Sequence, residues 1–156
     1  MEQVNALEVL REAMKLEREG VKFYRRVAKC SRNKSSAEVF RKLADDELQH
    51  LEKLELVYDN LAENNEWLVM KDLMETRRES PPEVFDEDFH DDEVDELSAV
   101  DMGIKAEEES IEHYKSALRE CDLSDEEGCE IFKWLIDFEA THLRILKDLR
   151  RELSSS

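Results

Sequence analysis

Apolar side chains recur along the chain at alternating spacings of three and four residues, the pattern produced by one face of an amphipathic helix. Four segments carry this pattern, at residues 7–28, 40–61, 97–118 and 132–153. Repeated apolar faces of this kind are typical of helices that pack together in a bundle. The pattern therefore predicts an all-α protein built on four long helices.

The four apolar stripes form two related pairs. The third stripe repeats the first at an offset of 90 residues, so that Leu7 corresponds to Leu97. The fourth stripe repeats the second at an offset of 92 residues, so that Phe40 corresponds to Phe132. The chain is therefore predicted to contain an internal duplication of a helical hairpin.

Short turns separate the two members of each pair, around residues 31–36 and 122–127. Turns this short make the two helices of a pair antiparallel neighbours. In each turn a serine, Ser35 or Ser124, stands three residues before a glutamate, which is the spacing of a capping box. We therefore expect these serines to begin the second helix of each pair.

A much longer connection, residues 62–96, joins the two pairs. Pro81 and Pro82 interrupt any continuous helix there, although residues 67–78 can form a short one. A connection of this length lets the second pair dock by a crossover, as in ferritin-like bundles. The expected architecture is a ferritin-like four-helix bundle of two duplicated antiparallel hairpins, with all 156 residues in one domain.

Each stripe also contains ionisable residues where an apolar side chain is expected. They are a lone glutamate on the first and third stripes and a Glu-x-x-His pair on the second and fourth: Glu17, Glu107, Glu47 with His50, and Glu139 with His142. Burying an unpaired carboxylate costs several kcal/mol, and no lysine or arginine lies on any stripe to pair with these. Two divalent cations would cancel the four negative charges, and neutral imidazoles would supply nitrogen ligands. The six residues are therefore predicted to hold two metal ions in the ferritin-like arrangement.

Tyr24 and Tyr114 each follow a stripe glutamate by seven residues, which places them two turns further along the same face. Either they only add apolar area to the core, or their hydroxyls bond the carboxylate of a metal ligand. Glu87 and His90 repeat the Glu-x-x-His spacing, but they lie in the acidic connection and off any stripe. No metal role is expected for that pair.

Composition narrows the classes of function. Acidic residues outnumber basic ones by 41 to 23, and the resulting net charge of −18 argues against binding to nucleic acids or anionic membranes. Ten of the acidic residues lie in residues 79–96, a run that is either merely solvated or attracts cations toward the bundle.

No apolar run approaches the roughly 20 residues that span a bilayer, so a cytoplasmic protein is expected. Cys30, Cys121 and Cys129 form no C-x-x-C pair, which favours idle thiols over a disulfide framework.

On these residues the chain resembles a rubrerythrin-type member of the ferritin-like superfamily. The resemblance covers nearly the whole chain and rests on Glu17-Arg-Glu-Gly-Val-Lys-Phe-Tyr24, Glu47-Leu-Gln-His50, Glu107-Glu-Glu-Ser-Ile-Glu-His-Tyr114 and Glu139-Ala-Thr-His142. It implies two iron ions bridged by Glu47 and Glu139, with one terminal glutamate and one histidine on each.

The implied activity is reduction of hydrogen peroxide, or of dioxygen, with each ferrous ion giving one electron. Related members oxidise and handle iron with oxygen, so a ferroxidase or iron storage protein is an alternative function. A structural site for manganese or zinc is a further alternative.

Two features depart from the family pattern. Rubrerythrins proper carry a rubredoxin module with two C-x-x-C pairs, and this sequence has neither pair. The resemblance therefore implies an external electron donor, such as a rubredoxin-like protein. The family also has a glutamate three residues after the third-helix ligand, where this chain has Ser110.

Three apolar residues lie off the stripes: Leu51, Tyr58 and Ile131. They either widen the core or form the face of a homodimer or larger oligomer.

Overall fold

The computed structural model describes residues 3–85, 95–120 and 126–155. Within these ranges the chain forms helices and no strand. The helices are α1 (Gln3–Cys30), α2 (Lys34–Asn64), α3 (Met70–Glu75), α4 (Glu96–Arg119) and α5 (Glu126–Ser155). The predicted all-α bundle of four long helices is confirmed.

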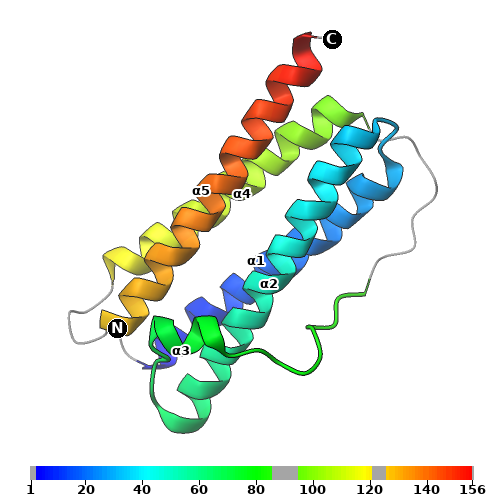
Figure 1. Ribbon diagram of the computed structural model, residues 1–156. Helices are drawn as coiled ribbons and strands as arrows, with labels where there is room; N and C mark the ends of the chain where they lie inside the picture. The colour runs from blue at the N-terminus through cyan, green and yellow to red at the C-terminus, as the bar shows by residue number, and fades with distance from the viewer. Residues whose placement is uncertain (1–2, 86–94, 121–125, 156) are drawn as a thin grey trace.

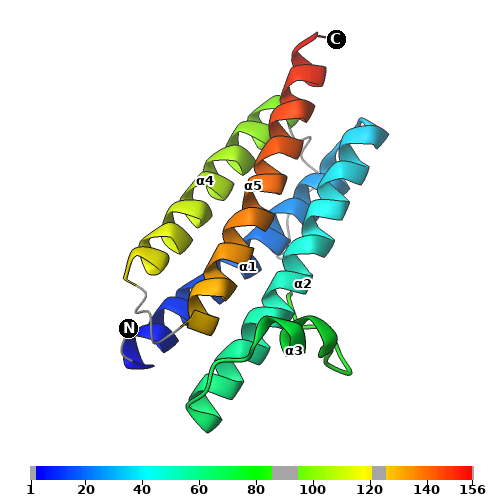
Figure 2. The ribbon, with the colours of Figure 1, turned by 60° about the vertical axis from the view of Figure 1, so that its left-hand side comes forward.

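The four long helices form two antiparallel hairpins that pack side by side (Figure 1). α1 packs mainly against α2 and α4 mainly against α5, while α1–α4 and α2–α5 contacts join the hairpins. α2 ends and α4 begins at opposite ends of the bundle, so these two helices run in the same direction. α5 extends beyond the other helices at its C-terminal end (Figure 2). This order of directions is the one expected when a crossover joins the hairpins.

Asn33 caps the start of α2. Its side-chain oxygen accepts hydrogen bonds from the backbone N–H groups of Ser35 and Ser36, at 2.9 and 3.3 Å. The prediction that Ser35 caps this helix is therefore wrong, because the earlier Asn33 already binds the free N–H groups of the first turn. The equivalent prediction for Ser124 lies outside the described residues.

The α3 region packs against the lower end of the bundle in Figure 1. The ammonium of the buried Lys53 donates to the backbone oxygens of Leu73 and Thr76, at 2.8 and 2.5 Å, where α3 ends. Trp67 packs over Gly128 of α5 so closely that a Cβ on this glycine would lie 2.9 Å from the indole. The short helix expected within residues 67–78 is thus present, although only six residues long.

Two apolar clusters fill the bundle, one toward each end. One cluster includes Leu10 and Phe132, and the other includes Phe40 and Leu146, all fully buried. Leu51 and Ile131 are also fully buried, so these off-stripe residues widen the core. Tyr58 is only half-buried, and its hydroxyl accepts a 2.6 Å hydrogen bond from Arg11. The oligomeric state stays a prediction.

The buried face of α4 combines large and small residues, and the stripe residues Val100 and Tyr114 are fully buried. Ala99, Gly103 and Ala117 are deeply buried, whereas the predicted core residues Leu97 and Ile104 are half-buried. A Cβ at Gly103 would lie 3.2 Å from Leu146 and 3.4 Å from Tyr24, tighter than most real contacts. The missing side chain of Gly103 therefore lets α4 approach both Leu146 of α5 and Tyr24 of the other hairpin.

The cysteines differ in part from the expectation of idle thiols. Cys30 is a free thiol, as expected, whereas Cys129 is disulfide-bonded. None of the described helices is both long and apolar enough to cross a membrane.

Candidate metal centre

Six ionisable side chains from the four long helices meet in the middle of the bundle. Glu17 comes from α1 and Glu107 from α4, while α2 and α5 each supply a Glu-x-x-His pair, whose spacing of three puts both residues on one helical face. Each of the six is at most 3% exposed. All of the sequence-predicted ligands are thus brought together: Glu17, Glu47, His50, Glu107, Glu139 and His142.

The cluster consists of two overlapping sets of four, in each of which the candidate ligand atoms lie within 4.8 Å of one another. The His50 set contains Glu17, Glu47, His50 and Glu139. The His142 set contains Glu47, Glu107, Glu139 and His142. Glu47 and Glu139 belong to both sets, which is the arrangement that two ions with two bridging carboxylates require.

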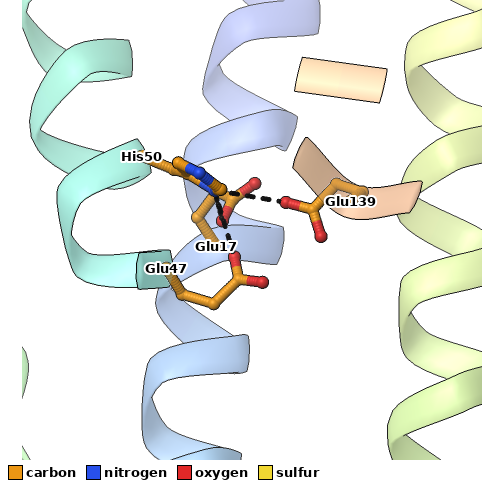
Figure 3. A group of neighbouring side chains, drawn as sticks. All are labelled: Glu17, Glu47, His50 and Glu139. Carbon is orange, nitrogen blue, oxygen red and sulfur yellow. Dashed lines mark ion pairs between the residues drawn. The ribbon is translucent and has the colours of Figure 1, made fainter. Parts of the chain in front are cut away.

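Both histidines aim the same ring nitrogen into the cluster. Nδ1 of His50 lies 3.4 Å from Glu139 and 3.6 Å from Glu17, and Figure 3 shows it facing carboxylates from three helices. Nδ1 of His142 lies 2.9 Å from Glu47 and 3.5 Å from Glu107. Each imidazole therefore offers Nδ1 as the ligand atom and leaves Nε2 pointing away from the four glutamates of the cluster.

Without an ion the cluster holds protons. Burial alone would lower the pKa of His50, but the nearby carboxylates of Glu139 and Glu47 outweigh burial and raise it to about 9. The pKa of His142 is raised for the same kind of reason, with Glu107 as its main partner. Burial raises the pKa of Glu139 well above its ordinary value, and the charge of Glu47 raises it further. A bound cation would have to displace these protons, so metal binding and proton release are coupled.

Several side-chain atoms of the cluster that could bind a metal ion are buried and have no hydrogen-bond partner in the described residues. They are Oε2 of Glu17, Oε2 of Glu107, Oε1 of Glu139 and both ring nitrogens of His50. Leaving such atoms unsatisfied is costly, and a cation would give the oxygens and the imidazole nitrogen a partner. Carboxylates with imidazoles suit iron, manganese or zinc. The residues present therefore fit a pair of divalent metal ions.

Two tyrosines bridge the hairpins at the cluster. The hydroxyl of Tyr24 donates to Oε1 of Glu107 at 2.6 Å, and that of Tyr114 donates to Oε1 of Glu17 at 2.7 Å. Burial raises the pKa of both tyrosines, and nearby carboxylates raise it further, so both keep their protons. They are therefore placed to fix the orientation of the two glutamates that belong to one set each.

Asp46 is a neighbour of the cluster that the sequence analysis missed. Its Oδ2 lies 3.1 Å from Nε2 of His142, on the side of the ring that faces away from the candidate ligands. Asp46 directly precedes Glu47 on α2, which is the only local signal of its position. Glu87 and His90, for which no role was expected, lie outside the described residues.

A cavity of about 180 Å³ lies between α1 and α4 and reaches Glu47 and Glu107. Apolar side chains form much of its wall, among them Leu16, Phe23 and Met102. Two small residues, Gly20 and Ser110, also line it. The cavity therefore gives a small molecule room beside the carboxylates.

Comparison with known proteins adds one match. A protein-family model described as rubrerythrin matches residues 8–150, a span that contains all six residues of the cluster. No curated protein and no solved structure matches the chain.

Proposed function

Because the chain belongs to the rubrerythrin family, we propose that it is a di-iron carboxylate oxidoreductase that reduces hydrogen peroxide. The observation that carries the proposal is the pair of ligand sets that share Glu47 and Glu139. Two ions held side by side can deliver two electrons together, which is the number that peroxide needs to become water.

In this proposal the six residues divide into three roles. Glu47 and Glu139, which belong to both ligand sets, would be shared by the two ions, Glu17 and Glu107 would each hold one ion, and each ion would have one histidine. When bound, the two ferrous ions supply one electron each for cleavage of the O–O bond, and with two protons this gives two molecules of water and two ferric ions. The four carboxylates balance the charge of the ferrous pair, which lets the centre exist in an apolar interior.

The surroundings of the cluster favour a small oxidant. The cavity between α1 and α4 reaches Glu47 and Glu107, and its volume of about 180 Å³ suits a small molecule. Tyr24 lines this cavity and donates to Glu107, so a proton is held where the oxidant arrives. These features support peroxide as the substrate, with dioxygen as the alternative of similar size.

Each peroxide consumes two electrons, so turnover requires a reductant. We propose an external donor such as a rubredoxin-like protein. The cytoplasmic location stays a prediction.

The test mixes the anaerobic diferrous protein with one equivalent of hydrogen peroxide in a stopped-flow spectrometer. The expected result is rapid conversion to a diferric spectrum, with one peroxide consumed per two irons. Glu139→Gln should lose the reaction, while Glu130→Gln, an exposed neighbour on α5, should keep it. Absence of the reaction in the wild type would overturn the proposal. More than two irons per chain after aerobic loading would instead favour iron storage, and manganese or zinc in protein from its native host would replace iron.

A further inference from the structure

The internal duplication allows the surroundings of the two histidines to be compared residue by residue. At the offset of 92 residues between α2 and α5, His50 corresponds to His142 and Glu47 to Glu139. The two rings stack with centroids 5.6 Å apart, and each directs Nδ1 at the shared carboxylates. Inside the cluster the duplication is therefore preserved, and any difference must lie behind the rings, at Nε2.

Behind His142 the environment is polar. Oδ2 of Asp46 lies 3.1 Å from Nε2 of His142, and the same oxygen is 3.7 Å from the ammonium of Lys42, one turn earlier on α2. The Asp46 side chain is only 23% exposed. When Nδ1 of a neutral imidazole binds a metal ion, Nε2 must carry the proton. Asp46 is placed to accept that N–H bond, and it does so from the other hairpin.

Behind His50 the environment is aromatic. The positions that correspond to Asp46 and Lys42 at the same offset are occupied by Phe138 and Trp134. The Phe138 ring lies 4.5 Å from the His50 ring at 72°, and the Trp134 ring lies 5.6 Å away at 73°. Nε2 of His50 is buried and has no hydrogen-bond partner in the described residues. Two aromatic contacts thus replace the carboxylate and its lysine.

We propose that the two metal positions are inequivalent and that Asp46 is the positioning residue that makes the His142 position the tighter one. A carboxylate on the far nitrogen fixes the orientation of the ring and makes the ligating nitrogen more basic, and losing such a partner typically costs about 10–100-fold in metal affinity. His50 has no such partner in the part of the chain that the structure describes. The ion at the His50 position therefore binds last and leaves first. This inference deepens the proposed function, because it concerns the same six ligands.

The test uses Co²⁺ and the metal-free full chain, followed anaerobically by calorimetry and by visible absorption. The wild type is expected to bind two ions in two steps, separated by about 10–100-fold in affinity. Asp46→Asn should weaken the first step by about this factor, so that the two steps merge. Asp45→Asn changes an exposed carboxylate one residue away and should keep both steps.

A reciprocal variant tests whether an added carboxylate increases the metal affinity of the His50 position. Phe138→Asp places a carboxylate at the duplicate of the Asp46 position, and Phe138 is 37% exposed, so the new charge stays in contact with water. This variant should tighten the second step, whereas Phe138→Leu should leave it unchanged. Proton NMR at one equivalent of Co²⁺ should show one strongly shifted exchangeable imidazole N–H signal, and Asp46→Asn should accelerate its exchange with solvent.

Several outcomes would overturn the inference. One is a single class of Co²⁺ sites in the wild type, and another is an Asp46→Asn protein that keeps both steps. Tighter binding by Asp46→Asn would mean that Asp46 only stabilises the protonated His142 of the metal-free protein, since a metal competes with that proton. Equal Co²⁺ affinities at the two positions, together with a normal peroxide reaction, would refute this inference alone. Two Co²⁺-binding steps without a peroxide reaction would refute the proposed function alone. Absence of Co²⁺ binding would overturn both.

Discussion

The hydroxyl of Tyr24 donates a 2.6 Å hydrogen bond to Glu107, which lies 83 residues further along the chain and in the other hairpin. The duplicate of this bond, from Tyr114 to Glu17, runs in the opposite sense at 2.7 Å. Each hairpin therefore orients a candidate metal ligand of the other. Both bonds are buried, so neither is weakened by competing water.

Tyr24→Phe should lower the stability of the metal-free protein by about 1–3 kcal/mol, because it leaves Oε1 of a buried Glu107 without its donor. Urea unfolding followed by circular dichroism measures the change. Tyr58→Phe is the control, since the Tyr58 hydroxyl bonds an arginine in an exposed setting. Equal losses in the two variants would show that the Glu107 bond contributes nothing special.

The stability of the metal-free protein should fall between pH 6.5 and 9. The pKa of His50 rises on folding from 6.5 to about 9, so its protonation stabilises the fold fully below pH 6.5, and this contribution is lost as the pH rises through 9. The raised pKa of Glu139 acts in the same direction. The hydrogen bond to His142 and the nearby His50 outweigh burial and lower the pKa of Glu47 to about 2, so its contribution is present above pH 4.5 and is lost only as the pH falls toward 2.

Urea unfolding across this interval checks the prediction, with an expected drop on the order of a few kcal/mol. His50→Gln should flatten part of the decline. Saturating metal should remove it, because the ligands bind a cation in their deprotonated forms and binding strengthens as the pH rises. A metal-free protein that becomes more stable from pH 6.5 to 9 would contradict the protonated cluster.

Glu17→Gln and Glu47→Gln should have different effects on metal content. Glu17 belongs to the His50 set alone, whereas Glu47 belongs to both sets. The first variant should therefore keep one tightly bound ion per chain, and the second should weaken both. Equilibrium dialysis against Zn²⁺ with elemental analysis gives the stoichiometry, and Glu12→Gln, exposed on α1, is the control. The same metal content in both glutamine variants would refute the shared role of Glu47.

Ser110→Leu should slow the reaction with hydrogen peroxide several-fold. Ser110 lines the cavity between α1 and α4, and leucine is a good helix former that fills this space without breaking α4. Ser110→Ala keeps the cavity open and should react like the wild type. Stopped-flow rates of the diferrous proteins provide the measurement. If the leucine and alanine variants react equally fast, peroxide reaches the centre by another route.

The six cluster residues were predictable because each interrupts an apolar stripe and recurs at a duplicated position. A carboxylate on such a stripe needs compensation wherever the helix packs, so that inference did not depend on details of packing. Asp46 was not predictable in this way, since it lies off the stripe and its partner His142 is 96 residues away. The signal that marks it is a break in the duplication, where Phe138 stands at the corresponding position.

The burial of α4 was predicted only in part. Periodicity correctly favoured Val100, which is fully buried, but it also favoured Leu97 and Ile104, which are half-buried, and it missed the buried Ala99 and Gly103. The sequence pattern weighs side chains by their hydrophobicity, but the face of a helix that lies closest to its neighbour depends on which side chains are small enough to let the helices approach. That choice involves Leu146 of α5 and Tyr24 of α1, which no local pattern in α4 contains.

Each ligand set takes three residues from one hairpin and a single residue from the other. A hairpin that associated with an identical copy would assemble the same two sets, but both ions would then experience identical neighbours. Joining two copies in one polypeptide removes that constraint, because a substitution in one half is no longer repeated in the other. The contrast between Asp46 and Phe138 is a difference of this kind: covalent fusion allows two chemically alike ligand sets to diverge into separate tasks.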